Sequence, residues 1–239
     1  GLLKNASEVD VGVLSQAEAV KLLVTAADMA PDEVEEGSDE LRIASEMAEL
    51  CGRLPLTLAI AGGMVSDNPN GFTEDVLELM KEDRLREQDD EGDSGMTLEE
   101  RVISSSLTMI KGKTKEVVER VFLFFAVFPE DVPVPAPFFN RMAPLLNDDK
   151  NEMKARLAVG SSLSTLLKYN LIKGSLSSGS GVFMHDIVRD YVINQHSEEE
   201  LRSLQKTVVE ERRGRQGACL LYTSPSPRDR TRSRMPSSA

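Results

Sequence analysis

Few side chains in this sequence could do covalent or metal chemistry. Its 239 residues include two histidines, His185 and His196, and two cysteines, Cys51 and Cys219. These residues are too few, and too far apart, to predict a zinc cluster or the cysteine–histidine pair of a hydrolase. The acidic pair Glu130–Asp131 follows a proline, and we expect a solvated turn there rather than an acid–base couple. The residues themselves therefore predict no catalytic site.

Two further positions are notable for where they stand in the sequence. Pro55 opens the apolar run LPLTLAIAGGMV, and a proline there is a common first residue of a helix. His185 ends a short apolar run, where a histidine most often forms a local hydrogen bond. Considered alone, both positions are structural.

A phosphate-binding loop of the GxxxxGK[ST] type is absent from the sequence. The only Gly-Lys pair, Gly112–Lys113, has no glycine at the required spacing before it and follows no predicted strand. No predicted strand ends in paired acidic residues that could hold magnesium. The chain therefore has neither a phosphate-binding loop nor magnesium-binding acids, and we expect no ATP hydrolysis by it.

The final segment, 219–239, differs abruptly in composition from the rest of the chain. Its stretches CLLYTSPSPRD and SRMPSSA resemble the one-frame translation of a transposase-type library adapter, so we expect a disordered artefact there. The segment holds four arginines and one aspartate; without it, 24 Lys+Arg stand against 39 Asp+Glu, a net charge of −15. A body so acidic repels nucleic acid.

The composition, 40% hydrophobic and 28% charged, is typical of a globular chain with one large domain or two small ones. Its longest apolar stretches, Leu54–Val65 and Val121–Phe128, are shorter than the ~20 residues that a membrane-spanning helix needs. No leader precedes them and two cysteines make no disulfide scaffold, which predicts a cytoplasmic chain. Because it opens on Gly1 and closes on the adapter-like segment, we expect a fragment at both ends.

The first part of the chain is predicted to be a small helical bundle over 14–83, after a remnant of an upstream domain at 1–13. Apolar residues recur there every three or four positions, as in amphipathic helices. Ser15 and Glu18 are spaced as a capping box, and Gly52 is placed to end a helix. The four helices are expected to open at 15, to cover 41–51, to run from 55 to 65 and to cover 74–82.

A second unit is predicted over 97–196, beyond an acidic linker at 84–96. Prolines at 129, 133, 135 and 137 exclude helix until about Phe138. Asp186 is placed to cap the last helix of this unit. We expect helices at 98–110, 116–128, 157–168 and 187–195, with a hairpin turning at 177–181 before the last of them.

The order of helices, hairpin and helix is that of a winged-helix domain. The predicted fold class is therefore mostly α, a four-helix bundle followed by a winged-helix domain with a short β-hairpin. Phenylalanines at helical spacing within 122–128 are expected in its core. A C-terminal helix or linker is expected over 197–218.

Three segments, in this order, resemble the NB-ARC family of STAND-type nucleotide switches, which includes plant disease-resistance proteins and the apoptosome scaffold. CGRLPLTLAIAGGMV (Cys51–Val65) is similar to the family's GLPL motif, and VFLFFAVFPEDVPVP (Val121–Pro135) to its aromatic FLFPED segment. FMHDIVRDYV (Phe183–Val192) resembles its MHD motif, after the similar stretch SSLSTLLKYNLIKGS. The resemblance covers residues 11–195 and implies a helical ARC1 subdomain followed by a winged-helix ARC2 subdomain.

The resemblance also implies a function. In this family bound ADP holds a closed state, and its exchange for ATP opens the molecule. The proline of the GLPL motif lies against adenine and the MHD histidine reaches the β-phosphate; carried over, these are Pro55 and His185, with weaker contributions from Leu54 and Leu56. Arg53 stands where the family commonly has glycine, and Thr57 replaces an alanine.

By the same resemblance, the ligand is ADP or ATP, with magnesium held by the parent protein, whose ATPase activity would be slow. The implied partners are an upstream P-loop domain and a downstream repeat domain of the same chain, with oligomers in the activated state and no nucleic acid or membrane. Two alternatives stay open. One is a winged-helix DNA-binding regulator, reading DNA with the helix at 157–168; the other is a scaffold module without nucleotide binding.

Overall fold

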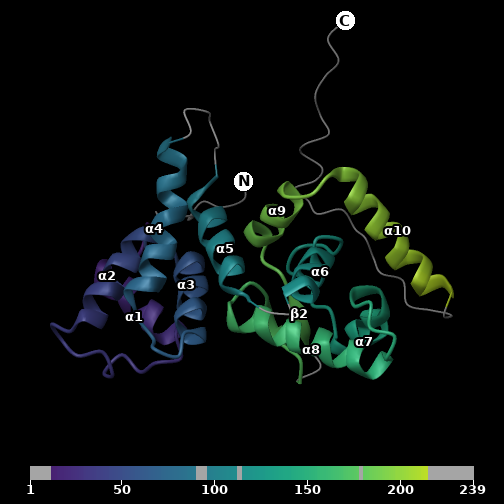
Figure 1. The fold of residues 1–239 in the computed structure, drawn as a ribbon, viewed down its shortest axis with the longest axis horizontal. Coiled ribbons are helices and arrows are strands. Elements are labelled where there is room, and N and C mark those ends of the chain that lie inside the picture. The colour runs from purple at the N-terminus through teal and green to yellow at the C-terminus, as the bar shows by residue number, and fades with distance from the viewer. Residues whose placement is uncertain (1–11, 90–95, 112–114, 178–179, 215–239) are drawn as a thin grey trace, which may run out of the picture. The chain divides into compact units, whose positions relative to one another are not determined.

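The computed structural model describes residues 12–89, 96–111, 115–177 and 180–214 (Figure 1). The fold is mostly α, as predicted, with ten helices and one two-stranded sheet in these ranges. Two compact units divide the chain: residues 1–112 with 168–171, and 113–167 with 172–239. The adapter-like segment, nearly all of the predicted upstream remnant and the pair Gly112–Lys113 lie outside the described residues.

Five helices build the first unit. α1 begins with the predicted capping box, in which the Glu18 N–H donates to Ser15 Oγ at 3.4 Å and the Ser15 N–H donates to Glu18 Oε2 at 3.1 Å. Ser38 caps α2 by accepting from the Leu41 N–H. The helices are α1 (Gln16–Ala26), α2 (Asp39–Leu50), α3 (Pro55–Asp67), α4 (Glu74–Asp89) and α5 (Leu98–Met109).

The centre of this unit is α3, which is apolar on nearly all sides and packs against both α1 and α5. Two adjacent glycines let other chain segments approach its backbone. A Cβ on Gly62 would lie 2.8 Å from the Ala26 carbonyl carbon, and one on Gly63 would lie 2.5 Å from the Lys168 carbonyl oxygen. Both distances are shorter than any Cβ contact tolerates, so this packing requires glycine at both positions.

Residues 168–171 belong to the first unit and are anchored at the end of α3. The carboxylate of Asp67 accepts from Lys168 Nζ and from Tyr169 Oη, each at 2.7 Å. Asn170 Nδ2 donates to the Ala59 carbonyl at 2.9 Å. Burial raises the pKa of Asp67, but the bonds from Lys168 and Tyr169 together hold it below its ordinary value. Burial and the adjacent carboxylate raise the pKa of Tyr169, which therefore stays a hydrogen-bond donor.

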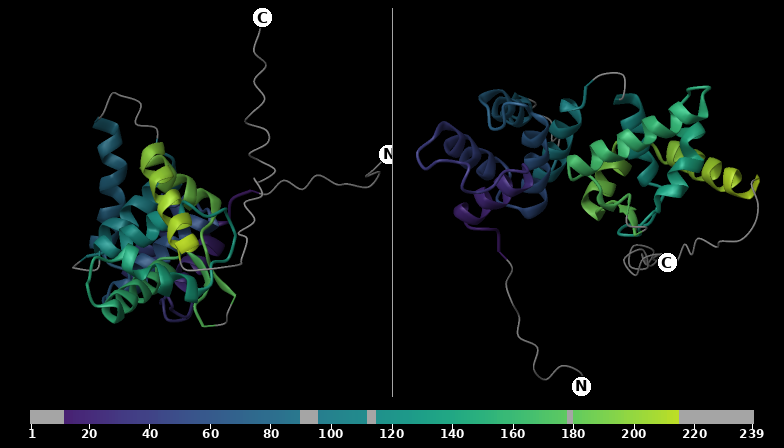
Figure 2. Two further views of the ribbon diagram at one scale, coloured as in Figure 1. Left: turned by 90° about the vertical axis from the view of Figure 1, so that its right-hand side faces the viewer. Right: turned by 90° about the horizontal axis from the view of Figure 1, so that it is seen from below.

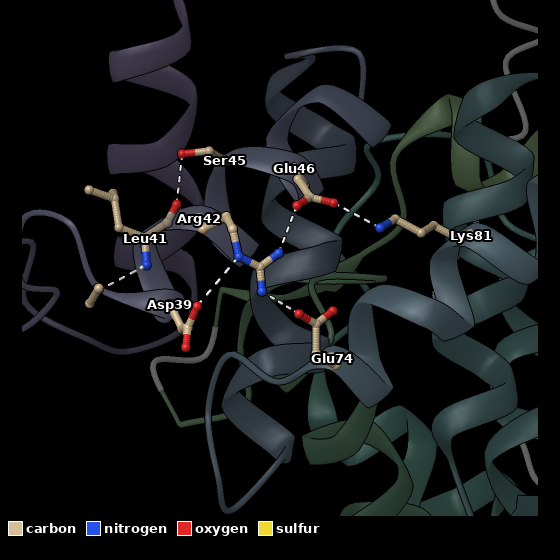
Figure 3. Close-up of polar contacts among 8 residues, drawn as sticks. Asp39, Leu41, Arg42, Ser45, Glu46, Glu74 and Lys81 are labelled. Atoms are coloured by element: carbon tan, nitrogen blue, oxygen red, sulfur yellow. Dashed lines mark hydrogen bonds and ion pairs between the residues drawn. The ribbon is translucent and has the colours of Figure 1, made fainter.

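A surface network of charges joins α2 to α4 (Figure 3). Arg42 of α2 pairs with Glu46 at 2.8 Å and with Glu74 at the start of α4, while Lys81 of α4 reaches Glu46 at 2.8 Å. The bonds to Glu74 and Glu46 raise the pKa of the Arg42 guanidinium. All these groups are solvent-exposed, so the network orients two helices and contributes little to stability.

The first unit is larger than the sequence predicted. α4 continues to Asp89, into the expected linker 84–96, whose residues 90–95 lie outside the described ones. α5 was expected to open the second unit. It packs instead against α3 and α4 and belongs to the first unit. Its buried Val102 and Ile103 supply the apolar face that makes this contact.

The second unit carries the predicted hairpin. β1 (Lys173–Ser175) pairs antiparallel with β2 (Gly181–Phe183), in a register that places Gly174 opposite Val182. Two further views show that helices make up nearly all of the remaining regular structure (Figure 2). These helices are α6 (Lys115–Phe125), α7 (Ala136–Leu146), α8 (Glu152–Lys168), α9 (Asp186–Asn194) and α10 (Glu198–Gly214).

An aromatic cluster forms the core between α6 and α7. Rings of Phe124, Phe125, Phe128, Phe138 and Phe139 contact one another at centroid distances of 5.2 to 6.3 Å. The prediction that the phenylalanines within 122–128 are buried is confirmed. Such ring pairs stabilise a core beyond the area that they bury.

Several boundaries in this unit differ from the predicted ones. α7, which was not predicted as an element, begins at Ala136, before the expected limit at Phe138, because Pro135 caps it and prolines fit the first turn of a helix. α8 begins at Glu152 rather than at 157, since the Asn151 side chain accepts from the N–H groups of its first turn. The segment expected as a helix or linker at 197–218 is helical through Gly214. None of the described helices could span a bilayer.

Replacing Gly63 by alanine should destabilise the first unit by about 1–3 kcal/mol, because the added methyl group would overlap the backbone of 168–171. Gly160 in α8 is the matched control: its Cβ position is open, so alanine there should stabilise the chain by about 0.5–1 kcal/mol. Urea unfolding followed by circular dichroism measures both changes. A Gly63→Ala variant as stable as the unaltered chain would show that the close approach is not required.

Candidate functional site

The predicted site residues lie in two separate segments, one in each unit, and the first segment is the turn between α2 and α3. After α2 ends at Leu50, Gly52 and Arg53 both adopt left-handed backbone conformations, with φ of 60° and 55°. The Arg53 N–H donates to the Ala48 carbonyl at 3.1 Å, which closes the end of α2. The two left-handed residues reverse the chain so that Pro55 can begin α3.

Pro55 occupies the first position of α3, as predicted, and its ring is exposed. Leu54 before it and Leu56 after it are half-buried. Leu54 offers no side-chain acceptor to the first turn of the helix, and Pro55 has no N–H that would lose a partner on contact with an apolar ligand. The ring is therefore a rigid apolar surface on which a flat base could stack.

Arg53 and Thr57, the two departures from the GLPL pattern, differ in how well they suit this turn. Four described residues other than glycine have positive φ; Asp28, Asp131 and Asn170 are of types that tolerate it, and Arg53 is not. The buried Thr57 hydroxyl lies 2.7 Å from the Cys51 carbonyl and 2.9 Å from the Leu54 carbonyl. Thr57 is thus satisfied inside the turn, whereas Arg53 stands in a conformation that favours glycine.

Cys51 in the same turn is no nucleophile. Its side chain is fully buried, and burial raises the pKa of the thiol to about 12. Its Sγ lies 3.7 Å from the Thr57 carbonyl, a weak hydrogen bond. The thiol fills space in the core and stays protonated at neutral pH.

The second segment leads from β2 into α9. Outside the hairpin, Val134 exchanges two backbone hydrogen bonds with Val182, at 2.7 and 2.9 Å. One step further along, the Asp131 N–H donates to the Met184 carbonyl at 3.3 Å. The FLFPED-like segment therefore pairs with the strand that ends in the MHD-like motif, and it fixes the backbone on which His185 stands.

His185 occupies the N-cap position of α9, and Asp186, which was predicted to be the cap, is the first residue of the helix, where its carboxylate accepts from the Ile187 N–H at 2.8 Å. The reason is the backbone: His185 has the extended conformation of a cap, with φ of −67° and ψ of 148°. Its ring is half-exposed, and Nδ1 lies 2.5 Å from Asp186 Oδ1. Half-exposed at the start of a helix, the imidazole can meet an anionic ligand.

Two residues of this region were missed in the sequence. Val134 lies in the proline-rich run, where alternation between valine and proline was the only signal for a strand-like pair. Arg189, on the first turn of α9, donates from Nε to the Phe128 carbonyl at 2.8 Å. Both residues connect the chain between α6 and α7 to β2 or α9, and neither carries a motif that reveals this in the sequence.

The structure assigns Pro55, Leu54 and Leu56 to the first unit and His185 to the second. Within the first unit, a hollow of about 20 Å³ has room for a single water molecule and not for a nucleotide. Among the described residues, no group of three or more acidic, histidine or cysteine side chains is placed to hold a metal ion. No protein-family model and no curated protein matches this chain.

Replacing Arg53 by glycine should stabilise the first unit by about 1 kcal/mol, because a side chain in the left-handed region costs roughly that much. Arg53→Ala removes the same charge and keeps the Cβ, so it should bring no such gain. Urea unfolding midpoints of the two variants test this. Equal midpoints, or a lower one for the glycine variant, would contradict the assignment of strain to Arg53.

Proposed function

We propose that this chain is the ARC1 and ARC2 portion of an NB-ARC nucleotide switch, in which bound ADP keeps the molecule closed and exchange for ATP opens it. Pro55, flanked by Leu54 and Leu56, would lie against the adenine, and His185 would reach the β-phosphate. The phosphates and magnesium would be held mainly by a P-loop domain elsewhere in the same protein. No catalytic residue is assigned to this chain.

The observation that carries this proposal is the backbone at Arg53. The family commonly has glycine at this position of its GLPL motif, and here φ is 55°, a conformation that favours glycine. A turn that favours glycine at Arg53 therefore supports the resemblance of this segment to the GLPL motif. Thr57 is compatible with the same conclusion, since its buried hydroxyl bonds to the Cys51 and Leu54 carbonyls within the turn.

The coupling of the other two motifs gives further support. The FLFPED-like and MHD-like segments are far apart in sequence, yet Val134 and Val182 join them by paired backbone bonds. Helix, hairpin and helix follow one another as a winged-helix ARC2 subdomain requires. A ligand contact at His185 would thus be transmitted to the aromatic core through the backbone.

The DNA-binding alternative is less well supported. Of the cations on α8, Arg156 pairs with Glu152 at 2.6 Å and Lys168 pairs with Asp67 at 2.7 Å. These two would have to break existing bonds to reach a phosphate backbone, in a chain of net charge −12. The sequence upstream of this chain would distinguish the switch from a scaffold without nucleotide binding. A GxxxxGK[ST] motif after a strand would favour the switch, and its absence would favour the scaffold.

The isolated chain should show no saturable binding of ADP in the micromolar range, because the main phosphate contacts are proposed to lie outside it. Isothermal titration calorimetry of ADP into the purified chain makes the measurement, with the protein that contains the P-loop domain as the positive control. Micromolar affinity in the isolated chain would contradict the division of the site.

In the protein that contains the P-loop domain, His185→Ala should speed ADP release by about tenfold to a hundredfold, the value of one hydrogen bond to a charged group. His196→Ala is the control, because His196 follows the C-terminal end of α9, whereas His185 precedes its first residue. The His196 Nδ1 lies 3.8 Å from Glu200 Oε2. Stopped-flow displacement of a fluorescent ADP analogue gives both rates. Equal release from the two variants would remove His185 from the site.

A further inference from the structure

We propose that Asp186 is a positioning residue for His185: it holds the proton of the imidazole on Nδ1 and leaves Nε2 as the nitrogen that meets a ligand. That this ligand is a phosphate rests on the proposed function. The tautomer itself follows from the hydrogen bonds around Asp186 and can be measured without any nucleotide.

The side chains of His185 and Asp186 make a short contact. His185 Nδ1 lies 2.5 Å from Asp186 Oδ1. A nitrogen and a carboxylate oxygen at this distance repel each other unless a hydrogen lies between them, and the carboxylate is an acceptor. Nδ1 therefore carries the hydrogen and donates it.

The backbone N–H of Ile187 has two possible acceptors. It lies 2.8 Å from Asp186 Oδ1 and 3.4 Å from His185 Nδ1. A protonated Nδ1 has no lone pair in the ring plane with which to accept, so the N–H donates to the carboxylate at the shorter distance. Asp186 Oδ1 thus accepts from both the helix and the ring.

This arrangement ties the direction of the ring to the helix. Asp186 is held by the first turn of α9, and the Arg189 N–H donates to the His185 carbonyl at 2.9 Å, which fixes the backbone of the capping residue. With Nδ1 occupied, Nε2 points away from the carboxylate. Asp186 therefore acts on a ligand through His185, and not by contact of its own.

The tautomer decides what Nε2 can do. In a neutral ring with hydrogen on Nδ1, Nε2 can only accept, and a phosphate oxygen also only accepts. Nε2 can bond to a phosphate only after it gains a proton, so nucleotide binding through His185 takes up a proton whenever the free ring is neutral.

The other charged residues on the segments next to this ring are Glu130, Asp131, Lys173, Arg189 and Asp190.

The chain contains an internal reference for this measurement. His196 is the only other histidine, and its Nδ1 lies 3.8 Å from Glu200 Oε2, beyond hydrogen-bond distance. Its tautomer is therefore not fixed by a carboxylate. Two histidines in the whole sequence also keep the imidazole spectrum simple enough to assign by substitution of either ring.

Long-range ¹H–¹⁵N correlation spectra of the ¹⁵N-labelled chain, recorded where both imidazoles are neutral, identify the protonated nitrogen of each ring. We expect hydrogen on Nδ1 in His185. Asp186→Asn keeps an acceptor oxygen and should retain this tautomer, whereas Asp186→Ala should shift it toward Nε2–H and leave the His196 signals unchanged. Hydrogen on Nε2 in the unaltered chain, or an Asp186→Ala spectrum identical to it, would overturn the inference.

A second experiment separates this inference from the proposed function. ADP titrations of the protein with the P-loop domain, in two buffers of different ionisation enthalpy, report the protons taken up on binding. We expect His185→Gln to take up fewer protons than the unaltered protein, by up to one. Equal uptake, with the tautomer as expected, would contradict the use of His185 for a phosphate and leave its positioning by Asp186 standing.

Discussion

The structure of the first unit depends on one constraint, the absence of side chains at Gly62 and Gly63. On one side of α3 the backbone of α1 approaches Gly62, and on the other the segment 168–171 approaches Gly63. At the end of the helix Asp67 bonds to both Lys168 and Tyr169. Because these contacts hold α3 along its second half, they also fix the helix at whose first position Pro55 stands.

Backbone conformation, more than side-chain contact, builds both of the segments that hold the predicted site residues. In the first unit, two left-handed residues turn the chain from α2 into α3 and leave the Pro55 ring exposed. In the second, the paired bonds between Val134 and Val182 hold the strand that delivers His185 to the start of α9. Side chains refine this frame: Thr57 is satisfied inside the turn, and Asp186 orients the imidazole.

Local signals predicted local structure well. The capping box at Ser15, the helix start at Pro55 and the hairpin before His185 each depend on residues within a few positions of one another, and the structure has all three. Predictions that depended on distant residues were less successful. The acidic run at 84–96 suggested a domain boundary, but α5 beyond it buries its apolar face against α3 and α4.

The sequence alone determined the mostly helical class, the beginnings of α1 and α3, and which residue types were available for a site, because capping and periodicity act over single turns of helix. Only the tertiary structure decided that α5 packs with the first unit, that Val134 pairs with Val182, and that His185 rather than Asp186 occupies the N-cap position of α9. The physical reason is that these outcomes depend on backbone geometry and on contacts between distant segments. No local pattern of residues encodes either of them.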